Sequence, residues 1–297
     1  MSSVPASDER RHRPGPQRLW GESWSLDFVS ADGSFAGSAR LGLYPHLKTA
    51  WYWAAVVGRG RRLVMVRDHD IALPPGESLE IRGGALWSMF NCETPLDHWS
   101  MGLEAYAVAL DDPTEAYRGE RGDRVGLGFD LEWEAVAPAQ AGSSGGHYEQ
   151  SCRVHGEVLV GEEQLAIDGS GQRNHRWGVD DWWSVPAWGR AWGTLSDGAV
   201  FSVWTDGRSG YLVSPAGDLS GLGELPPELQ AATAGDGLLT GGSVTVGDLS
   251  LAAVPLADAP VALPTGSGLA RLARALIRYR STDGREGAGW MEWLERP

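Results

Sequence analysis

The chain has 297 residues, enough for two domains of ~100–200 residues each. It carries 25 Lys and Arg against 39 Asp and Glu, and the resulting net charge of −14 argues against a nucleic-acid partner. Apolar runs such as residues 51–57 are far shorter than the roughly 20 residues of a membrane-spanning helix, and no secretory signal is readable after the basic start. Because Cys92 and Cys152 lack the spacing of a disulfide framework, we predict small buried thiols and a cytoplasmic location.

Taken in chain order, the sequence begins with a predicted disordered leader, residues 1–17, whose charges and prolines leave almost nothing to bury. Apolar and polar residues then alternate on either side of a turn at 31–34, which predicts a β-hairpin. Further strands are predicted at 51–57, 62–66, 78–81, 98–110 and 129–136. Small, turn-prone residues from 137 to 146 predict a linker, so residues 18–140 are interpreted as an N-terminal β-barrel.

Alternation resumes after the linker, and residues 147–297 are predicted to form a C-terminal β-barrel. Residues 214–240 are predicted to be an irregular insertion with one turn of helix around 227–231. Residues 268–280 fit either a helical stripe or a strand face, and the hairpin turn after them favours the strand, with its arginines on a solvated face.

The composition supports an all-β fold. The 41 glycines and 17 prolines are spread along the chain, as expected for many short strands joined by tight turns. The absence of helical segments between strands argues against a parallel sheet, and antiparallel strands in such numbers avoid exposed edges by closing into barrels or packing as sandwiches. We therefore predict two antiparallel barrels or sandwiches packed side by side.

Tryptophan is in excess, with 15 residues in all. Six of these lie between Trp177 and Trp204. Because an indole offers a large apolar area and one N–H donor, this density indicates either a very aromatic core or a cavity walled by indoles.

One segment, residues 168–183 (DGSGQRNHRWGVDDWW), combines several reactive groups. Gly169 and Gly171 predict a tight turn. Beyond it, an extended backbone would direct alternate residues to opposite sides, with Arg173, His175 and Trp177 on one side and Asn174 and Arg176 on the other.

This segment supplies the candidate catalytic residues. An imidazole and two carboxylates beside indoles suit proton transfer to an apolar substrate, because burial raises the pKa of a carboxyl group. We assign Asp180 or Asp181 as proton donor, His175 as base or orienter, and Arg173 as substrate anchor or ion-pair partner of those aspartates. The candidate substrate-binding residues are Trp177, Trp182, Trp183, Trp188, Trp99 and Glu104. The alternative is structural: a histidine bound to a carbonyl, indoles in a packed core, and Glu104 in solvent.

Signatures of cofactor and metal sites are missing from the sequence. It contains no phosphate-binding loop, no dinucleotide fingerprint, no nucleophile elbow and no zinc-protease motif. The seven histidines show no ligand-like spacing, so we predict neither cofactor nor metal, while a metal site assembled only in the folded chain stays open.

Five motifs together resemble a known family. They are WSLDF at 24–28, PLDHW at 95–99, LEA at 103–105, the glycine-rich segment 169–178 and the final segment 283–292. In these motifs the chain resembles the two-barrel, calycin-like proteins related to hydroxyneurosporene synthase (carotenoid 1,2-hydratase), a group with many actinobacterial members. The resemblance implies a cofactor-free protein with a ligand cavity in or between two lipocalin-like barrels. Asn174 stands where that group commonly has Asp, which leaves open whether an acidic group is replaced here.

Three functions are compatible with these observations. The first is a cofactor-independent hydratase, isomerase or cyclase acting on a hydrophobic isoprenoid or polyketide-like substrate in a Trp-lined cavity. The second is a lipocalin-like carrier of a lipid or pigment, and the third is a non-catalytic interaction domain. We favour the enzyme, with a hydrophobic small molecule as its partner, and leave the oligomeric state open.

Overall fold

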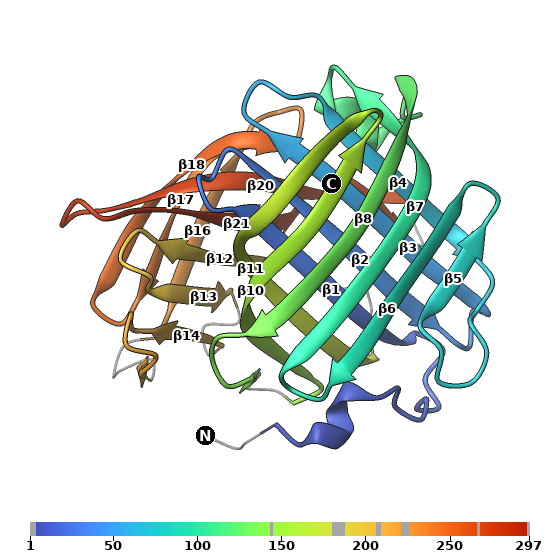
Figure 1. Cartoon of the computed structure of the whole chain (residues 1–297), viewed down its shortest axis with the longest axis horizontal. Helices are drawn as coiled ribbons and strands as arrows, with labels where there is room; N and C mark the ends of the chain where they lie inside the picture. Colours follow the sequence, from blue (N-terminus) through green and yellow to red (C-terminus); the bar gives the residue numbers. More distant parts are fainter. Residues whose placement is uncertain are drawn as a thin grey trace.

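The computed structural model describes residues 4–142, 145–179, 188–205, 209–220, 226–265 and 268–295. Nearly all of its regular structure is antiparallel β-strand, arranged as two large sheets that lie side by side (Figure 1). The predicted all-β fold is therefore confirmed. No helix among the described residues is long and apolar enough to cross a membrane.

The first sheet is a closed ring. It comprises β1 (Trp20–Ser30), β2 (Phe35–Tyr44), β3 (Thr49–Gly58), β4 (Leu63–Ile71), β5 (Glu80–Gly83), β6 (Leu86–Thr94), β7 (His98–Leu110), β8 (Asp123–Ala135), β9 (Gln140–Ala141), β10 (His147–Val160) and β11 (Glu163–Val179). The order is β4-β3-β2-β1-β11-β10-β8-β7-β6-β5, and a second pairing of β7 with β4 closes the ring. Two 3-10 helices accompany it, η1 (Ala6–Glu9) before β1 and η2 (Pro113–Tyr117) after β7.

The second sheet is a curved half-barrel. Its strands are β12 (Trp188–Leu195), β13 (Val200–Trp204), β14 (Gly210–Val213), β15 (Leu219–Ser220), β16 (Glu228–Thr233), β17 (Leu239–Val246), β18 (Leu249–Asp258), β19 (Val261–Thr265), β20 (Gly268–Ser281) and β21 (Glu286–Glu295). The order is β15-β14-β13-β12-β21-β20-β18-β17-β16, with β19 paired to β20. The strand predicted at 268–280 is confirmed by β20.

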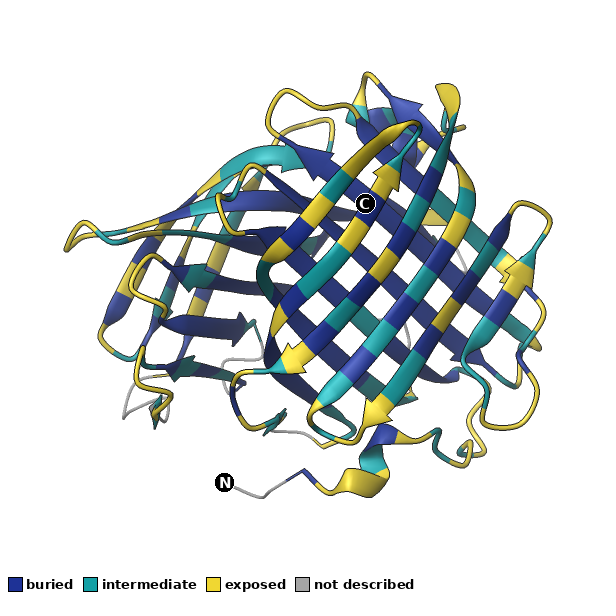
Figure 2. Cartoon of the chain, viewed as in Figure 1, coloured by how far each residue is buried: buried dark blue, intermediate teal, exposed yellow. Residues whose placement is uncertain are grey.

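Strand β1 is buried on both faces (Figure 2). Its even-numbered residues, such as Trp24 and Phe28, pack inside the ring with Trp133 of β8. Its odd-numbered residues face the second sheet, where Val29 packs in a cluster with Trp192 of β12. Because alternate side chains of a strand point to opposite faces, β1 and its neighbours form a wall shared by two cores.

The boundary between the two sheets lies after Val179, further along the chain than the linker predicted at 137–146. Residues 147–179 were assigned to the second barrel, yet they form β10 and β11, which close the first ring between β8 and β1. The first sheet ends at Val179 and the second begins at Trp188. The small residues at 137–146 thus connect strands of one ring, because the ring needs β11 to pair with β1 and leave no free edge there.

Residues 4–17 are ordered against the ring, contrary to the prediction of a disordered leader. They include η1, and Glu9 at its end is only 3% exposed. A poorly apolar segment can be ordered in this way because its buried charge is neutralised by Arg173 of β11.

Two local predictions are also wrong. Residues 227–231, predicted as a turn of helix, lie largely in β16, which pairs with β17. The expected turn at Gly169 and Gly171 does not occur, because both glycines lie inside the continuous strand β11. A Cβ at Gly169 would come within 2.1 Å of the Val29 carbonyl oxygen, so these glycines permit β1 to approach closely.

Candidate functional site

The two faces of β11 lead to two separate polar clusters. In the antiparallel register His175 lies opposite Trp24 of β1, and Asn174 lies opposite Ser25. Arg173 and His175 therefore point into the end of the ring, whereas Asn174 and Arg176 face the second sheet. The predicted alternation of this segment is confirmed: Arg173 and His175 share one face of β11, and Asn174 and Arg176 lie on the other.

We call the first group the ring-end cluster; it contains Glu9, His12, Glu22, Trp99, Tyr148, Gln150, Arg173, His175 and Trp177. Arg173 donates from Nη2 to Glu9 Oε1 at 2.7 Å and from Nη1 to Glu9 Oε2 at 3.0 Å. Trp99 Nε1 donates to the same Glu9 Oε2 at 2.8 Å. Burial alone would raise the pKa of Glu9, but the hydrogen bonds and charge of Arg173 outweigh burial and hold that pKa below its ordinary value.

His175 is 1% exposed and is held on both sides of its ring. Nδ1 lies 2.7 Å from the Asp8 carbonyl oxygen, and Nε2 lies 3.0 Å from Glu22 Oε1. Trp24 stacks on the imidazole at a centroid distance of 4.5 Å, and Trp177 stacks on His12 at 4.0 Å. Burial lowers the pKa of His175, which the hydrogen bond and charge of Glu22 offset only in part.

The second group lines a cavity between the two sheets, which we call the inter-sheet cavity. It has a volume of about 40 Å³ and is bounded by β1, β2, β3 and β11 on one side and by β12, β13, β20 and β21 on the other. Three indoles line it: Trp53, Trp188 and Trp204. The charged lining consists of Asp27, Arg40, Arg176, Arg190, Arg274 and Glu292. Four arginines against two carboxylates make this lining cationic in a protein of net charge −14.

Buried ion pairs in this lining join the sheets. Asp27 of β1 lies 2.9 Å from Arg274 Nη2 and 3.3 Å from Arg190 Nη1. Arg274 also donates from Nε to Glu292 at 3.0 Å, and Arg190 Nε lies 2.7 Å from Glu149. Arg274 was predicted on a solvated face, but it is 4% exposed, because β20 turns this position toward the first sheet and Asp27.

Several N–H donors of the cavity lining have no acceptor among the described residues. They are Trp53 Nε1, Trp204 Nε1, Asn174 Nδ2 and Arg190 Nη2. Leaving a buried donor without an acceptor costs about 1–3 kcal/mol, so such groups are uncommon and call for an explanation. All four atoms are donors, so oxygen atoms of water or of a ligand in the cavity would satisfy them.

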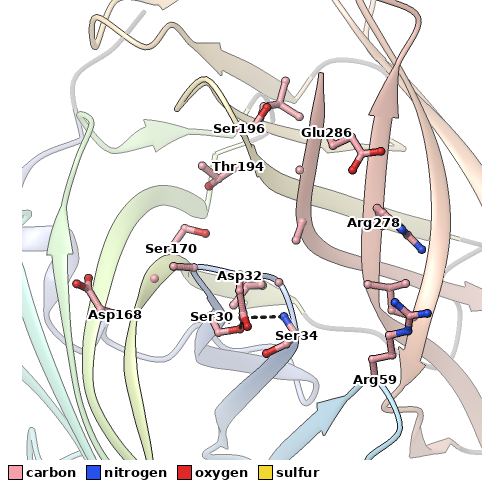
Figure 3. Close-up of a pocket in the computed structure, with 18 of the residues that line it drawn as sticks. Ser30, Asp32, Ser34, Arg59, Asp168, Ser170, Thr194, Ser196, Arg278 and Glu286 are labelled. Atoms are coloured by element: carbon pink, nitrogen blue, oxygen red, sulfur yellow. Dashed lines mark hydrogen bonds between the residues drawn. The ribbon is translucent and has the colours of Figure 1, made fainter. Parts of the chain in front are cut away.

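A larger cleft of about 770 Å³ lies beyond the other end of β1 (Figure 3). Its lining mixes short polar side chains, arginines and apolar residues. Asp32 there is held within the β1–β2 turn by Ser30 Oγ at 2.7 Å and Ser34 N at 2.9 Å (Figure 3). No tryptophan lines it among the described residues. Thr194 Oγ1 and Arg278 Nε of this cleft are also buried without a partner among the described residues. We take the smaller inter-sheet cavity as the candidate site because its lining combines indoles with buried charges.

The other predicted residues are dispersed. Trp99 is buried inside the ring, and Glu104 is exposed on the outer face of β7. Asp180, Asp181, Trp182 and Trp183 lie outside the described residues. Both cysteines are free, with Cys152 buried and Cys92 half-buried.

Sequence reasoning missed the charged cavity residues Asp27, Arg190 and Arg274. The one available signal was local: a charged residue at a polar position of a strand that is otherwise strongly apolar, as in WSLDF. In an antiparallel sheet with one solvent-exposed face, such a residue is expected on that face. Asp27 is buried here because the second sheet covers that face of β1.

Comparisons with known proteins agree with this architecture. NE1406, an AttH-like protein of Nitrosomonas europaea, has a TM-score of 0.65 at 10% identity, over 99% of this chain and 97% of that one. Kievitone hydratase of Nectria haematococca has a TM-score of 0.60 at 13% identity, over 94% and 90%. CghA, also solved with Sch210972, has a TM-score of 0.56 at 10% identity, over 94% and 88%.

At these identities the likeness shows the fold, and it confirms the predicted two-barrel, lipocalin-like architecture. No curated protein sequence matches the chain. The profile described as "Domain of unknown function (DUF7064)" matches residues 5–297. The chain therefore belongs to the DUF7064 family.

Proposed function

We propose that this protein is a cofactor-independent hydratase, isomerase or cyclase that acts on a hydrophobic molecule, of which one oxygen-bearing group enters the inter-sheet cavity of about 40 Å³. The observation that carries the proposal is the set of N–H donors without acceptors on a wall that also carries three indoles and buried charges. Two proteins of the same fold, kievitone hydratase and CghA, make an enzyme of this type a reasonable expectation.

The donors fit a reaction in which negative charge develops on oxygen. Asn174 Nδ2 and Trp204 Nε1 would donate to a carbonyl or enolate oxygen of the substrate, and these bonds strengthen as charge grows in the transition state. Arg190, 3% exposed, adds a fixed positive charge at low dielectric. The indole faces would contact the apolar part of the substrate.

The proton donor is proposed to be Asp180 or Asp181, which follow β11 directly in the sequence. Asp27 is less suited because it accepts from Arg274, Arg190 and Trp192 Nε1, so its oxygens are committed to joining the sheets. Because Asn174 and His175 lie on opposite faces of β11, a ligand in the inter-sheet cavity would contact Asn174 and not His175.

The proposal is tested by incubating the full chain with kievitone, prenylated phenols and linear polyenes, and following products by chromatography and mass spectrometry. Hydration adds one water to the mass, whereas isomerisation or cyclisation changes retention at constant mass. We expect Asn174→Ala to lower turnover ~100–1,000-fold by removing one donor to the developing oxyanion. Asn91→Ala, on β6 outside the inter-sheet cavity, is the matched control and should leave turnover unchanged.

The alternative is a carrier of a lipid or pigment. It is favoured by the fact that Asp27, Glu149 and Glu292 are all engaged by arginines. Asp181→Asn separates the two functions: an enzyme would lose turnover and keep ligand binding, whereas a carrier would show no turnover before or after the change. Binding without turnover for the whole panel would contradict the enzyme.

A further inference from the structure

Three side chains from distant parts of the chain converge in the ring-end cluster. His12 comes from the leader, Glu22 from β1 and His175 from β11, and one ligand-type atom of each lies within 4.8 Å of the others. Glu22 Oε1 is 2.8 Å from His12 Nδ1 and 3.0 Å from His175 Nε2. Two imidazole nitrogens thus face one carboxylate oxygen, in a place that the proposed reaction does not use.

The second nitrogen of each imidazole also faces an oxygen atom of the protein. His175 Nδ1 faces the Asp8 carbonyl oxygen at 2.7 Å, and since a carbonyl oxygen only accepts, Nδ1 carries the proton. In the neutral ring Nε2 then presents a lone pair toward Glu22 Oε1, and two lone pairs at 3.0 Å need a positive charge between them. His12 Nε2 similarly faces the Asp8 carboxylate at 3.7 Å. Histidines that bind metals typically direct their other nitrogen to a carbonyl or carboxylate in this way.

The charge balance of the ring-end cluster also favours a metal ion at Glu22, as a comparison with Glu9 shows. Both glutamates are 3% exposed, but Glu9 is paired with Arg173, whereas Glu22 is paired with histidines alone in the part of the chain that the structure describes. A buried carboxylate is costly unless it is paired with a cation or binds a metal. A divalent ion at Glu22 would supply the charge that the guanidinium supplies at Glu9.

The ligand set also matches a class of metal. Two imidazoles and one carboxylate suit Zn²⁺ and similar transition ions better than Mg²⁺ or Ca²⁺, which prefer oxygen ligands. The rings are held in place by Trp24, stacked on His175 at 20°, and Trp177, stacked on His12 at 11°. The His12 side chain is 24% exposed, which gives an ion a route from solvent.

We infer that His12, Glu22 and His175 form a binding site for one divalent transition-metal ion such as Zn²⁺. The ion binds between the leader and the end of the ring, and it fastens η1 to strands β1 and β11. Three protein ligands leave a fourth tetrahedral position for water. The site is separate from the inter-sheet cavity because its ligands on β1 and β11 lie on the opposite faces of those strands.

The test titrates the full chain, stripped with a chelator and dialysed, with Zn²⁺ by calorimetry and with Co²⁺ by visible absorption. We expect one ion per chain, Co²⁺ bands of a tetrahedral site, and a rise in Tm with Zn²⁺. Partners that only orient a metal ligand already contribute ~10–100-fold in affinity, so His12→Ala and Glu22→Gln, which remove a ligand, should weaken binding at least as much.

The control variant is His155→Ala, since His155 faces Glu134 at 3.4 Å in a more exposed histidine–carboxylate pair. It should bind the ion as the unmodified chain does. His12→Ala keeps the test decisive if Glu22→Gln does not fold, because His12 is the most exposed of the three ligands. Absence of binding to the unmodified chain, or equal binding by His12→Ala, would overturn the inference and leave a proton as the positive charge between Glu22 and the two histidines.

Discussion

The two faces of β11 differ in what their polar groups contact. On the ring face, the terminal nitrogens of Arg173 donate to Glu9, Tyr148 and Gln150, and both nitrogens of His175 have oxygen partners, although Arg173 Nε is buried without a partner among the described residues. On the opposite face, the amide nitrogen of Asn174 is buried with no acceptor among the described residues. Matched polar groups hold parts of a protein together, whereas unmatched donors are the groups that a ligand can satisfy.

The polar lining of the inter-sheet cavity also has a structural role, which is to hold the two sheets together. Its carboxylates and Arg274 form a continuous network of ion pairs, and only donors at the cavity wall lack acceptors. The same region therefore joins the sheets and offers a binding surface. The predictions below separate these two roles.

The largest effect is expected from Asp27→Ala. This change leaves Arg190 and Arg274 with an uncompensated buried charge between the sheets, and breaking such a network costs about 3–5 kcal/mol. The measurement is urea denaturation of the full chain. Asp283→Ala, in an exposed pair with Arg285, is the control and should change stability by less than about 1 kcal/mol. A loss of similar size for both variants would show that the network does not join the sheets.

Glu9→Gln should give the next largest effect and should depend on pH. The pKa of Glu9 is held below its ordinary value in the folded chain, so its contribution is present at neutral pH and is lost as pH falls below about 4.5 through the folded-state pKa. We expect the variant to be about 2–3 kcal/mol less stable at pH 7, because Arg173 stays buried without its carboxylate.

The check for Glu9 is denaturation at two pH values, together with protease cleavage of the leader. The difference from the unmodified chain should shrink at pH 3, and cleavage before β1 should become faster. If the difference were the same at both pH values, the ionised form of Glu9 would not be what holds η1 to the ring.

Much of the fold follows from local patterns. The alternation from His98 to Leu110 predicts β7 with the bounds that the structure shows. The hairpin of β1 and β2 and strand β20 follow in the same way, because each has one strongly apolar face and a nearby turn.

The parts that could not be predicted all depend on contacts between distant residues. Composition alone marks residues 1–17 as disordered, but Glu9 meets Arg173, which is 164 positions away. The ring closes through β11 on β1 and β7 on β4, so the small residues before β10 look like a domain linker. The histidines of the inferred metal site are likewise separated by most of the first sheet, which is why no ligand spacing is visible in the sequence.

The smallest effect, and the most direct comparison of the two faces, comes from removing one indole N–H on each. Trp99→Phe deletes a donor that Glu9 accepts at 2.8 Å, and we expect a loss of about 1–3 kcal/mol because a buried carboxylate oxygen loses its partner. Trp204→Phe deletes a buried donor that has no acceptor among the described residues, so we expect a smaller loss of stability than in Trp99→Phe. Chemical denaturation measures both, and affinity for a ligand of the cavity should fall only in Trp204→Phe. An equal loss of stability in the two variants would mean that the Trp204 N–H is satisfied within the protein, and the donors of the inter-sheet cavity would no longer argue for a ligand.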